Sequence, residues 1–465
     1  MTDDASLSDL RQEMELLTLE IVKLAGRRSE LAAKIGAEKI KKGIELVDRE
    51  VERNLKAKVV EQCRRDASDI DFALQLVNEL ITESIRKQES HFETQVPQTA
   101  YHIFVKARKL ESAGKEVFHL EVGEPDFGPP VTVCESMSNA VAGGHAGYTQ
   151  SAGIQELRTK IAEHMNRFLG ADISADQVIA TVGGRFALYL SLATSLRPGD
   201  EAIIINPSYP AYSDCIRQVG GRPVHVSTQL ENEWELDIGS LEDNINQTTR
   251  MIILNSPCNP TGKILDKSTI EKIVEISIEN EILIVSDEVY SEFSFTPHTS
   301  TLQFPECNQI YVNSFSKSFG MTGFRLGYAI SNVETVQKMI KLQNLSLTCV
   351  PEFIQYAGVK ALDLLDEVKE YATIIENRQT VLCDKLEKLP LSFRRPDGGF
   401  YIFPKLNLDN LDGLEFAQRL LIEKGVAVVP GTAYGQEYSR FFRISVCQPE
   451  DILVEAAKRM EEILG

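Results

Sequence analysis

Six short apolar runs, separated by helix-like segments, constrain the fold of this chain more than any other feature. They cover residues 117–122, 177–182, 202–206, 251–255, 283–286 and 310–313. Many of them are continuously apolar rather than alternating, which is typical of parallel strands that helices bury on both faces. The sequence therefore predicts an α/β layer fold from about residue 99 onward. In such a sheet, ligands bind beyond the carboxyl ends of the strands.

Polar residues with a chemical use follow these runs. Lys317 comes shortly after the last run, three residues after Ser314 and eight before Arg325. A lysine amine held there can form a Schiff base, while the serine and arginine can hold a phosphate. Gly183 and Gly184 precede a helix-like segment, and the free amides of a helix start also suit a phosphate. Each feature alone also fits a surface loop or a simple turn.

Composition limits the partners that the chain can have. Its 465 residues exceed one ordinary core, so two or three domains are expected. The net charge of −19 argues against nucleic acid as a partner. The eight cysteines and seven histidines are scattered without a CxxC pair, which indicates free thiols in a reducing cytosol and gives little support for a metal site. The first residues are unlike a signal peptide, and no apolar run approaches the length of a membrane span. We therefore expect a cytoplasmic protein without membrane partners.

The first ninety residues carry helical periodicity instead. Apolar residues recur at alternating spacings of three and four, at Leu7, Leu10, Met14, Leu17, Ile21, Leu24, Leu31 and Ile35. This spacing predicts one long helix with a seam of the coiled-coil type, and the position between Leu24 and Leu31 holds Arg28. Two amphipathic segments follow, at about residues 48–63 and 70–88. The first helix is too long to bury its own seam, so the sequence predicts a helical dimer.

We expect four polar or charged side chains in the otherwise apolar interior of this dimer. The residues expected there are Arg28, Lys39, Ser84 and Gln88. A charge on an apolar seam needs a partner or a ligand, and basic groups with neutral donors suit a small dianion. The alternative is a plain dimerisation coiled coil in which Arg28 pairs with a glutamate such as Glu30 or Glu52, because buried polar residues often only set the register.

This segment resembles the all-helical class of chorismate mutase over about residues 5–90. The resemblance is carried by Leu10-Arg11, the stretch from Arg27 to Ala32, Lys39, Asp48 with Glu52, and Ser84 with Gln88. It implies that the two substrate carboxylates are held by Arg28 of one subunit and by Arg11 of the partner subunit. It also implies that Lys39 and Gln88 donate to the ether oxygen, that Asp48 and Glu52 contact the ring hydroxyl side, and that Ser84 is a further contact. The family usually has arginine before Glu52, where this chain has Val51. This difference leaves open a helical arm that serves only for dimerisation or for sensing an aromatic ligand.

Residues 99–465 resemble the class I and II aminotransferases, which bind pyridoxal phosphate (PLP). The resemblance is carried by the lysine stretch, by Asn255 to Gly262, by Asp287 to Tyr290 and by Arg440 to Arg443. It implies a cofactor site formed by Lys317, Ser314, Arg325, Gly184, Arg185, Tyr209, Asn259, Asp287 and Tyr290. In the family the aspartate pairs with the pyridine nitrogen, and the asparagine and tyrosine contact the ring oxygen. The resemblance also implies that Arg443 grips the substrate α-carboxylate, that Gly123 belongs to the substrate-side entry loop, and that Tyr148 reaches the other subunit's phosphate.

The predicted architecture is multidomain. It consists of an all-α three-helix domain resembling chorismate mutase at residues 1–92, a linker at 93–98, and an α/β PLP-dependent transferase of fold type I at 99–465. Within the second region we expect a large, mainly parallel-sheet domain at about 126–335. A small α/β domain would combine about 99–125 with 336–465.

The resemblances together imply a bifunctional enzyme of aromatic amino acid biosynthesis. The expected substrates are chorismate, an amino acid and an aromatic-pathway keto acid, the expected cofactor is PLP, and the expected assembly is at least a homodimer. One alternative is a general aspartate or alanine aminotransferase with a non-catalytic helical arm. Another is a PLP enzyme of a different reaction type, such as a C–S lyase or a synthase, on the same fold. The side-chain specificity is left open by the sequence.

Overall fold

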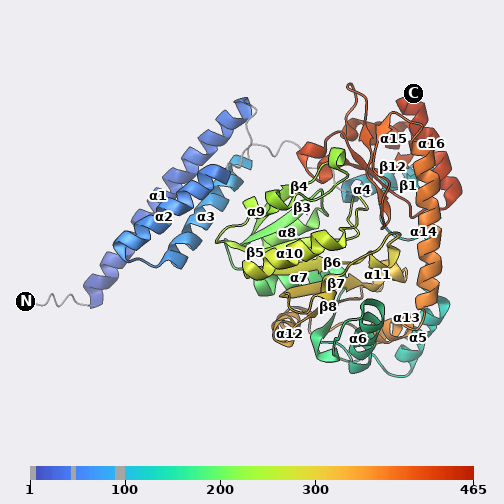
Figure 1. Cartoon of the computed structure of the whole chain (residues 1–465), viewed down its shortest axis with the longest axis horizontal. Helices are drawn as coiled ribbons and strands as arrows, with labels where there is room; N and C mark the ends of the chain where they lie inside the picture. The colour runs from blue at the N-terminus through green and yellow to red at the C-terminus, as the bar shows by residue number, and fades with distance from the viewer. Residues whose placement is uncertain (1–6, 43–48, 90–99) are drawn as a thin grey trace, which may run out of the picture. The chain divides into compact units, whose positions relative to one another are not determined.

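The computed structural model describes residues 7–42, 49–89 and 100–465. The chain divides into two compact units, one of Met1–Val96 with Pro198–Asp200, and one of Pro97–Arg197 with Glu201–Gly465 (Figure 1). The predicted linker at 93–98 lies outside the described residues. Within the described part of the chain, no helix is both long enough and apolar enough to cross a membrane.

The first unit contains the three expected helices. They are α1 (Leu7–Lys42), α2 (Arg49–Asp66) and α3 (Ile70–Glu89). Helix α3 packs against both α1 and α2. Because α1 has 36 residues, it is ~54 Å long, whereas α3 with 20 residues reaches only ~30 Å. Much of α1 therefore extends beyond α3, its main neighbour among the described residues of this unit.

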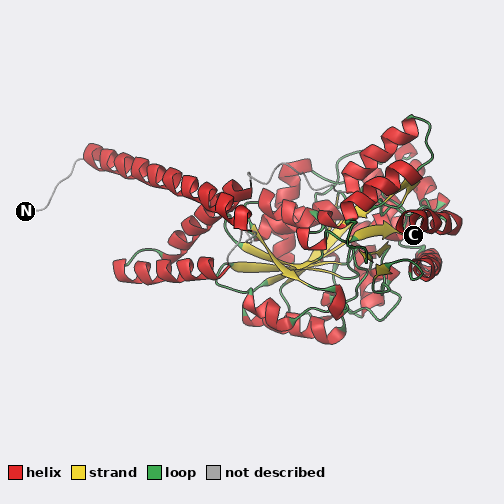
Figure 2. Ribbon diagram, turned by 90° about the horizontal axis from the view of Figure 1, so that it is seen from above, coloured by secondary structure: helices red, strands yellow, loops and turns green. Residues whose placement is uncertain are grey.

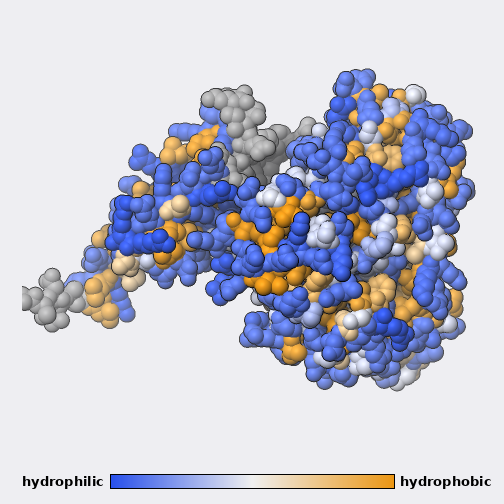
Figure 3. Space-filling view, viewed as in Figure 1, coloured by the Kyte–Doolittle hydropathy of each residue, from blue (hydrophilic) through white to orange (hydrophobic). Residues whose placement is uncertain are grey.

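The apolar seam of α1 remains exposed in the single chain. Its eight predicted positions, from Leu7 to Ile35, are each 50–67% exposed. Hydrophobic side chains are visible along the helical unit in Figure 3. A contiguous apolar stripe of this length is typical of a surface that binds another protein.

The second unit contains a seven-stranded sheet of order β2-β8-β7-β6-β5-β3-β4. Strand β8 runs antiparallel to both neighbours, and the other strands are parallel. The strands are β2 (Val178–Thr181), β3 (Glu201–Asn206), β4 (Arg222–Ser227), β5 (Thr249–Asn255), β6 (Leu283–Asp287), β7 (Gln309–Ser314) and β8 (Gly327–Ser331). Five of the six predicted runs therefore lie in this sheet.

Helices cover both faces of this sheet, as Figure 2 shows. Ile284 of β6 packs in one apolar cluster with Ile252, while the next residue, Val285, packs in another with Ile253. Both faces of a strand must then be apolar, which explains the continuous runs. The helices of this layer are α5 (Val131–Ala142), α6 (Gln155–Leu169), α7 (Gly184–Ser195), α8 (Ala211–Gln218), α9 (Ile238–Asp243), α10 (Lys267–Glu279), α11 (Phe315–Ser318), α12 (Val333–Leu347) and α13 (Glu352–Ala361).

The run at 117–122 does not join the large sheet. It forms the short strand β1 (Phe118–His119), which pairs in parallel with β12 (Val426–Ala427). Strands β4 and β8 were not expected. Burial alternates along β4, so this strand has no continuous apolar run, and β8 has only three apolar residues between Gly327 and Ser331.

A smaller layered part combines segments before the large sheet with the last hundred residues of the chain. A three-stranded antiparallel sheet has the order β10 (Tyr401–Ile402), β14 (Phe442–Ser445) and β13 (Val429–Pro430), and β9 (Leu391–Ser392) pairs with β11 (Lys405–Leu406). Its helices are α4 (Ala100–Ser112), α14 (Leu365–Leu386), α15 (Gly413–Lys424) and α16 (Glu450–Leu464). One aromatic-rich core, including Phe118, Phe400, Phe416 and Phe442, holds this part together.

The packing of α12 and α13 corrects the sequence-based boundary at residue 335. Val336 and Met339 of α12 pack with the core under the seven-stranded sheet. Ala357 of α13 packs with the cluster that contains Leu157 of α6. These two helices therefore pack with the large sheet, and α14 passes from that core, at Val368, to the core of the small part, at Ile375 and Leu382.

Candidate functional site

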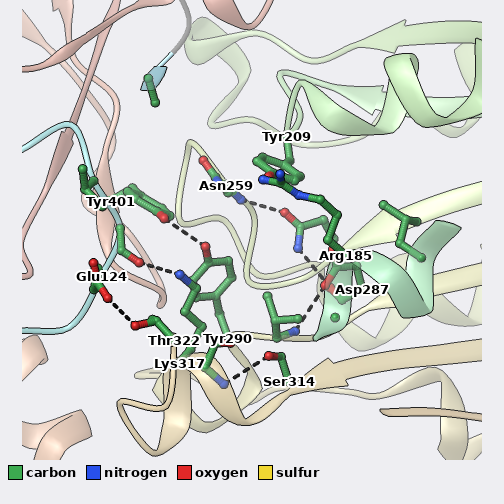
Figure 4. A pocket seen from close by; sticks show the side chains of 18 of the residues that line it. Glu124, Arg185, Tyr209, Asn259, Asp287, Tyr290, Ser314, Lys317, Thr322 and Tyr401 are labelled. Atoms are coloured by element: carbon green, nitrogen blue, oxygen red, sulfur yellow. Dashed lines mark hydrogen bonds between the residues drawn. The ribbon is translucent and has the colours of Figure 1, made fainter. Parts of the chain in front are cut away.

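A cavity of about 650 Å³ lies at the carboxyl edge of the large sheet (Figure 4). Strands β5, β6 and β7 end there at Asn255, Asp287 and Ser314, and Asn255 pairs with Asp287 in register. The cavity is lined by eleven of the residues predicted from the sequence, namely Gly123, Gly184, Arg185, Tyr209, Asn259, Asp287, Tyr290, Ser314, Lys317, Arg325 and Arg443. The fold thus gathers residues that lie more than 300 positions apart in the chain.

Lys317 is held in the single turn of α11 directly after β7. Its Nζ donates a hydrogen bond to the carbonyl oxygen of Gly123 at 2.5 Å. Burial lowers the pKa of the Lys317 amine, and the nearby Arg443 and Arg325 charges act in the same direction. A lowered pKa increases the share of neutral amine, which is the nucleophilic form.

One end of the cavity forms a cradle for an anion. Helix α7 begins after Gly183, which has φ 79° and leaves the helix start without a side-chain cap. A Cβ on Gly183 would lie 2.6 Å from Nη2 of Arg325, so the arginine occupies the space that only glycine leaves free. Ser314 lies beside the helix start, with its Cβ 3.2 Å from a Cβ placed on Gly184. Uncapped amides, a hydroxyl and a guanidinium together fit a phosphate.

Asp287 is the buried carboxylate of the site. Its Oδ2 accepts a hydrogen bond from the Tyr212 hydroxyl at 2.7 Å, and its Oδ1 accepts from the Val289 amide at 3.4 Å. Burial raises the pKa of Asp287 to about 6, although the Tyr212 hydrogen bond and the Lys317 charge oppose this rise. Near neutral pH the carboxylate is therefore mostly ionised and can pair with a cationic ring nitrogen.

The other end of the cavity is built around Arg443 of β14. The arginine is 4% exposed, and Nη1 donates to Oδ1 of Asn259 at 3.0 Å. Its Nη2 donates to the carbonyl oxygen of Glu121, and its Nε has no hydrogen-bond partner. Among the described residues no carboxylate forms an ion pair with it, so a ligand carboxylate fits this guanidinium.

Three tyrosines complete the walls. Tyr401 lies under the Arg443 guanidinium, with the ring centroid 4.1 Å from Cζ, and its hydroxyl is 2.9 Å from that of Tyr290. A Cβ on Gly123 would lie 1.7 Å from the Tyr401 hydroxyl, so only glycine fits there. The Arg185 guanidinium donates to the hydroxyl of Tyr209.

Residues 115–460 match the family Aminotransferase class I and II. The chain belongs to this family. An aspartate aminotransferase of Sulfurisphaera tokodaii is 35% identical over 370 residues, covering 77% of this chain and 92% of the relative. An aromatic-amino-acid aminotransferase of Thermococcus litoralis is 36% identical over 378 residues, covering 79% and 96%. The solved aspartate aminotransferase of Thermotoga maritima is 33% identical with a TM-score of 0.76, covering 80% and 98%.

The aminotransferase part is PLP-dependent, as its family is. The residues present fit this cofactor, because the cradle at Gly183 and Gly184 suits its phosphate and Asp287 suits its ring nitrogen. When bound, PLP supplies an electron sink for reactions at the substrate Cα. The predicted fold class is confirmed by these matches.

Residues 10–89 match a second family, Chorismate mutase type II. The chain thus contains a chorismate mutase domain before its aminotransferase domain, and the suspected fusion is confirmed. Both families are enzymes, an isomerase and a transferase.

Within the mutase domain the structure brings Arg28 and Ser84 together. Nη1 of Arg28 donates to the Ser84 hydroxyl and to the Leu80 carbonyl oxygen, and burial lowers the pKa of the arginine. Among the described residues of the chain, no carboxylate forms an ion pair with Arg28. Lys39 and Glu52 are half-buried in α1 and α2.

Of the remaining predicted mutase residues, the structure places only Arg11 away from Arg28. Arg11 is exposed, 17 residues before Arg28 on the same helix and therefore ~26 Å away along it. Asp48 lies outside the described residues. Gln88 is part of α3, but its side chain is not described. An arginine at this distance can contribute to a site only through another copy of the chain.

Tyr148 also lies away from the cavity of its own chain. Its side chain is 89% exposed. The loop around it is anchored by Gly147, whose amide donates to Oε2 of Glu352 at 3.0 Å, and by Thr149, whose amide donates to Sγ of Cys349 at 3.4 Å. Its role across a dimer stays a prediction.

Among the lining residues that sequence reasoning missed are three that contact predicted site residues or lie beside them. Tyr212 and Asn255 line the cavity beside Asp287, and Tyr401 lies under Arg443. Asn255 had a usable signal, because it ends a strand next to the strand of Asp287. The sequence signal for Tyr401 was weaker, namely the glycine pair Gly398-Gly399 shortly before it. Tyr212 follows Tyr209 by three residues, and nothing in the sequence relates it to Asp287.

Proposed function

We propose that this chain is a bifunctional enzyme that rearranges chorismate to prephenate and transaminates an aromatic-pathway keto acid. The keto acid is prephenate, phenylpyruvate or 4-hydroxyphenylpyruvate, with glutamate or aspartate as the amino donor. The single observation that carries this proposal is the presence of a mutase domain and an aminotransferase domain in one chain. Prephenate is itself a keto acid, so one domain can supply the other. An aromatic aminotransferase among the relatives supports the substrate class.

In the proposed transamination each residue has one task. Gly184, Arg185, Ser314 and Arg325 hold the phosphate end, and Tyr209 covers the ring. Asp287 pairs with the pyridine nitrogen, and Asn259 and Tyr290 contact the ring oxygen. Arg443 grips the α-carboxylate and thereby orients the substrate Cα toward Lys317, whose amine accepts the Cα proton.

In the proposed mutase reaction the chain needs neither a nucleophile nor a proton donor. The rearrangement is intramolecular, so catalysis consists of holding the compact conformer and stabilising charge on the breaking C–O bond. Arg28 of one subunit and Arg11 of the partner subunit hold the two carboxylates. Lys39 and Gln88 donate to the ether oxygen. Ser84, Asp48 and Glu52 complete the site. The exposed seam of α1 supports the homodimer that this arrangement requires.

A set of acceptor assays tests the proposed specificity. The measurement is kcat/KM of the full chain for prephenate, phenylpyruvate, 4-hydroxyphenylpyruvate, oxaloacetate and pyruvate, with glutamate or aspartate as donor. We expect at least one aromatic-pathway acid to exceed oxaloacetate and pyruvate.

The second candidate is a general aspartate aminotransferase with a non-catalytic arm. The aspartate aminotransferases among the relatives favour it. It predicts that oxaloacetate is the preferred acceptor and that the chain consumes no chorismate.

A further inference from the structure

Tyr212 is a buried tyrosine whose hydroxyl points at the Asp287 carboxylate. It is the second residue of α8 and is 1% exposed. Its hydroxyl donates to Oδ2 of Asp287 at 2.7 Å, across 75 positions of sequence. Because the residue also lines the cavity, its hydroxyl lies where a cofactor ring would meet the aspartate.

The tyrosine ring itself is fixed in place. It makes an edge contact with the Tyr209 ring, with centroids 5.6 Å apart and planes at 86°. Its other neighbours belong to the apolar core under the sheet, including Ile204 and Ile253. A donor on so rigid a support sets the orientation of the group that it binds.

The carboxylate has few other anchors. Oδ1 accepts only a long bond of 3.4 Å from the Val289 amide. The charged and titratable groups that face Asp287 are Tyr212 from α8, Lys317 from α11, Cys258 from the loop after β5, and Tyr290.

The hydrogen bond from Tyr212 opposes the protonation of Asp287, and burial keeps the tyrosine itself protonated. Burial raises the pKa of Asp287, and the Tyr212 hydrogen bond is the largest of the influences that lower it. The pKa of the Tyr212 hydroxyl is itself raised well above its usual value, chiefly by burial. The tyrosine therefore remains a donor at every pH at which the aspartate titrates.

We propose that Tyr212 is a positioning residue that keeps Asp287 ionised and correctly oriented toward the pyridine nitrogen of PLP. This inference rests on the proposed pairing of Asp287 with that nitrogen. Loss of the hydroxyl leaves one carboxylate oxygen without its donor, so the aspartate takes up a proton more readily. A protonated aspartate cannot form the ion pair with the cofactor ring.

The test compares PLP binding by the full-length wild type and by Tyr212→Phe. The dissociation constant is measured by fluorescence from about pH 5.5 to about pH 8.5, on both sides of the Asp287 midpoint. We expect Tyr212→Phe to bind PLP about tenfold more weakly near pH 6.5, because the ionised form of Asp287 has lost its strongest hydrogen bond. This difference in PLP affinity should shrink toward high pH, where Asp287 is ionised in both the wild type and Tyr212→Phe.

A second readout does not involve the cofactor. The midpoint of Asp287 in the PLP-free protein is followed by carbon NMR with labelled aspartate, and Asp287→Asn assigns the signal. We expect a midpoint near 6 in the wild type and a higher one in Tyr212→Phe. This measurement reports on the folded protein even if Tyr212→Phe lowers the Tm.

Two control variants separate the possible failures. Tyr328→Phe removes another buried tyrosine hydroxyl, one that contacts the Met165 sulfur, and should change neither readout. If Tyr212→Phe weakens PLP binding by the same factor at every pH, or leaves the Asp287 midpoint unchanged, the inference is overturned. If Asp287→Asn keeps the wild-type affinity and pH profile, the proposed pairing itself is wrong.

Discussion

The amine of Lys317 donates to the carbonyl oxygen of Gly123 at 2.5 Å, and this contact joins two distant parts of the cavity wall. Lys317 follows strand β7 of the large sheet, whereas Gly123 lies in the segment after β1. The same glycine leaves the space into which the Tyr401 hydroxyl fits. The position of the nucleophile therefore depends on both the large sheet and the small part.

Replacing the lysine should separate the two activities. Lys317→Ala removes the only amine proposed to hold PLP covalently, so transamination and the absorbance of the lysine-bound cofactor should both be lost. Chorismate consumption should remain at the wild-type rate, because the mutase chemistry uses no cofactor. Loss of both activities in a still-folded variant would contradict the model of two independent sites.

A single methyl group on Gly123 should disturb the site. In Gly123→Ala the new Cβ would lie 1.7 Å from the Tyr401 hydroxyl, so either Tyr401 or the Gly123 carbonyl must move. We expect kcat/KM for transamination to fall at least about tenfold, since small misplacements of reacting groups are costly. Steady-state kinetics measure the fall. Gly128→Ala is the matched control, because its Cβ meets no atom within 4 Å and should have little effect.

The substrate carboxylate is proposed to bind Arg443. Arg443→Gln should raise KM for the amino donor and lower kcat/KM by about 100-fold or more, because losing one partner of a buried charge pair costs on the order of 2–5 kcal/mol. The PLP dissociation constant should change much less. The control is Arg440→Gln, which breaks only an exposed ion pair with Asp409 and should leave the kinetics nearly unchanged. Equal effects of the two variants would argue against a substrate role for Arg443.

The mutase domain allows a similar pairwise test. Arg28→Ala should lower chorismate turnover by about 100-fold, because a charge-assisted contact from this half-buried arginine to a carboxylate contributes on the order of 3 kcal/mol. Transamination should be unaffected. Arg27→Ala removes the neighbouring exposed arginine and should retain the activity. An Arg28→Ala variant with full mutase activity would contradict the proposed binding of a chorismate carboxylate by Arg28.

Local signals were enough to place the strand-end residues. Asp287 and Ser314 each end an apolar run, so their position at the carboxyl edge of the sheet follows from the sequence. The contact of Arg28 with Ser84 follows in the same way from helical spacing.

Other features depend on pairings that no local pattern specifies. Tyr401 reaches Arg443 because β10 pairs with β14, more than 40 residues later in the chain. Tyr212 meets Asp287 only because α8 packs under the sheet. The large domain was predicted to end at about residue 335. The sequences of α12 and α13 do not indicate that these helices pack with the large sheet.

One incubation tests the central claim most directly. The full-length protein is given chorismate, PLP and ¹⁵N-labelled glutamate or aspartate, and mass spectrometry follows prephenate and the aromatic amino acids. We predict that chorismate is consumed, that prephenate forms, and that ¹⁵N appears in arogenate directly, or in phenylalanine or tyrosine once the matching keto acid is supplied. Unchanged chorismate, or ¹⁵N transfer only to oxaloacetate or pyruvate when these are offered alongside the aromatic acids, would contradict the proposed bifunctional enzyme.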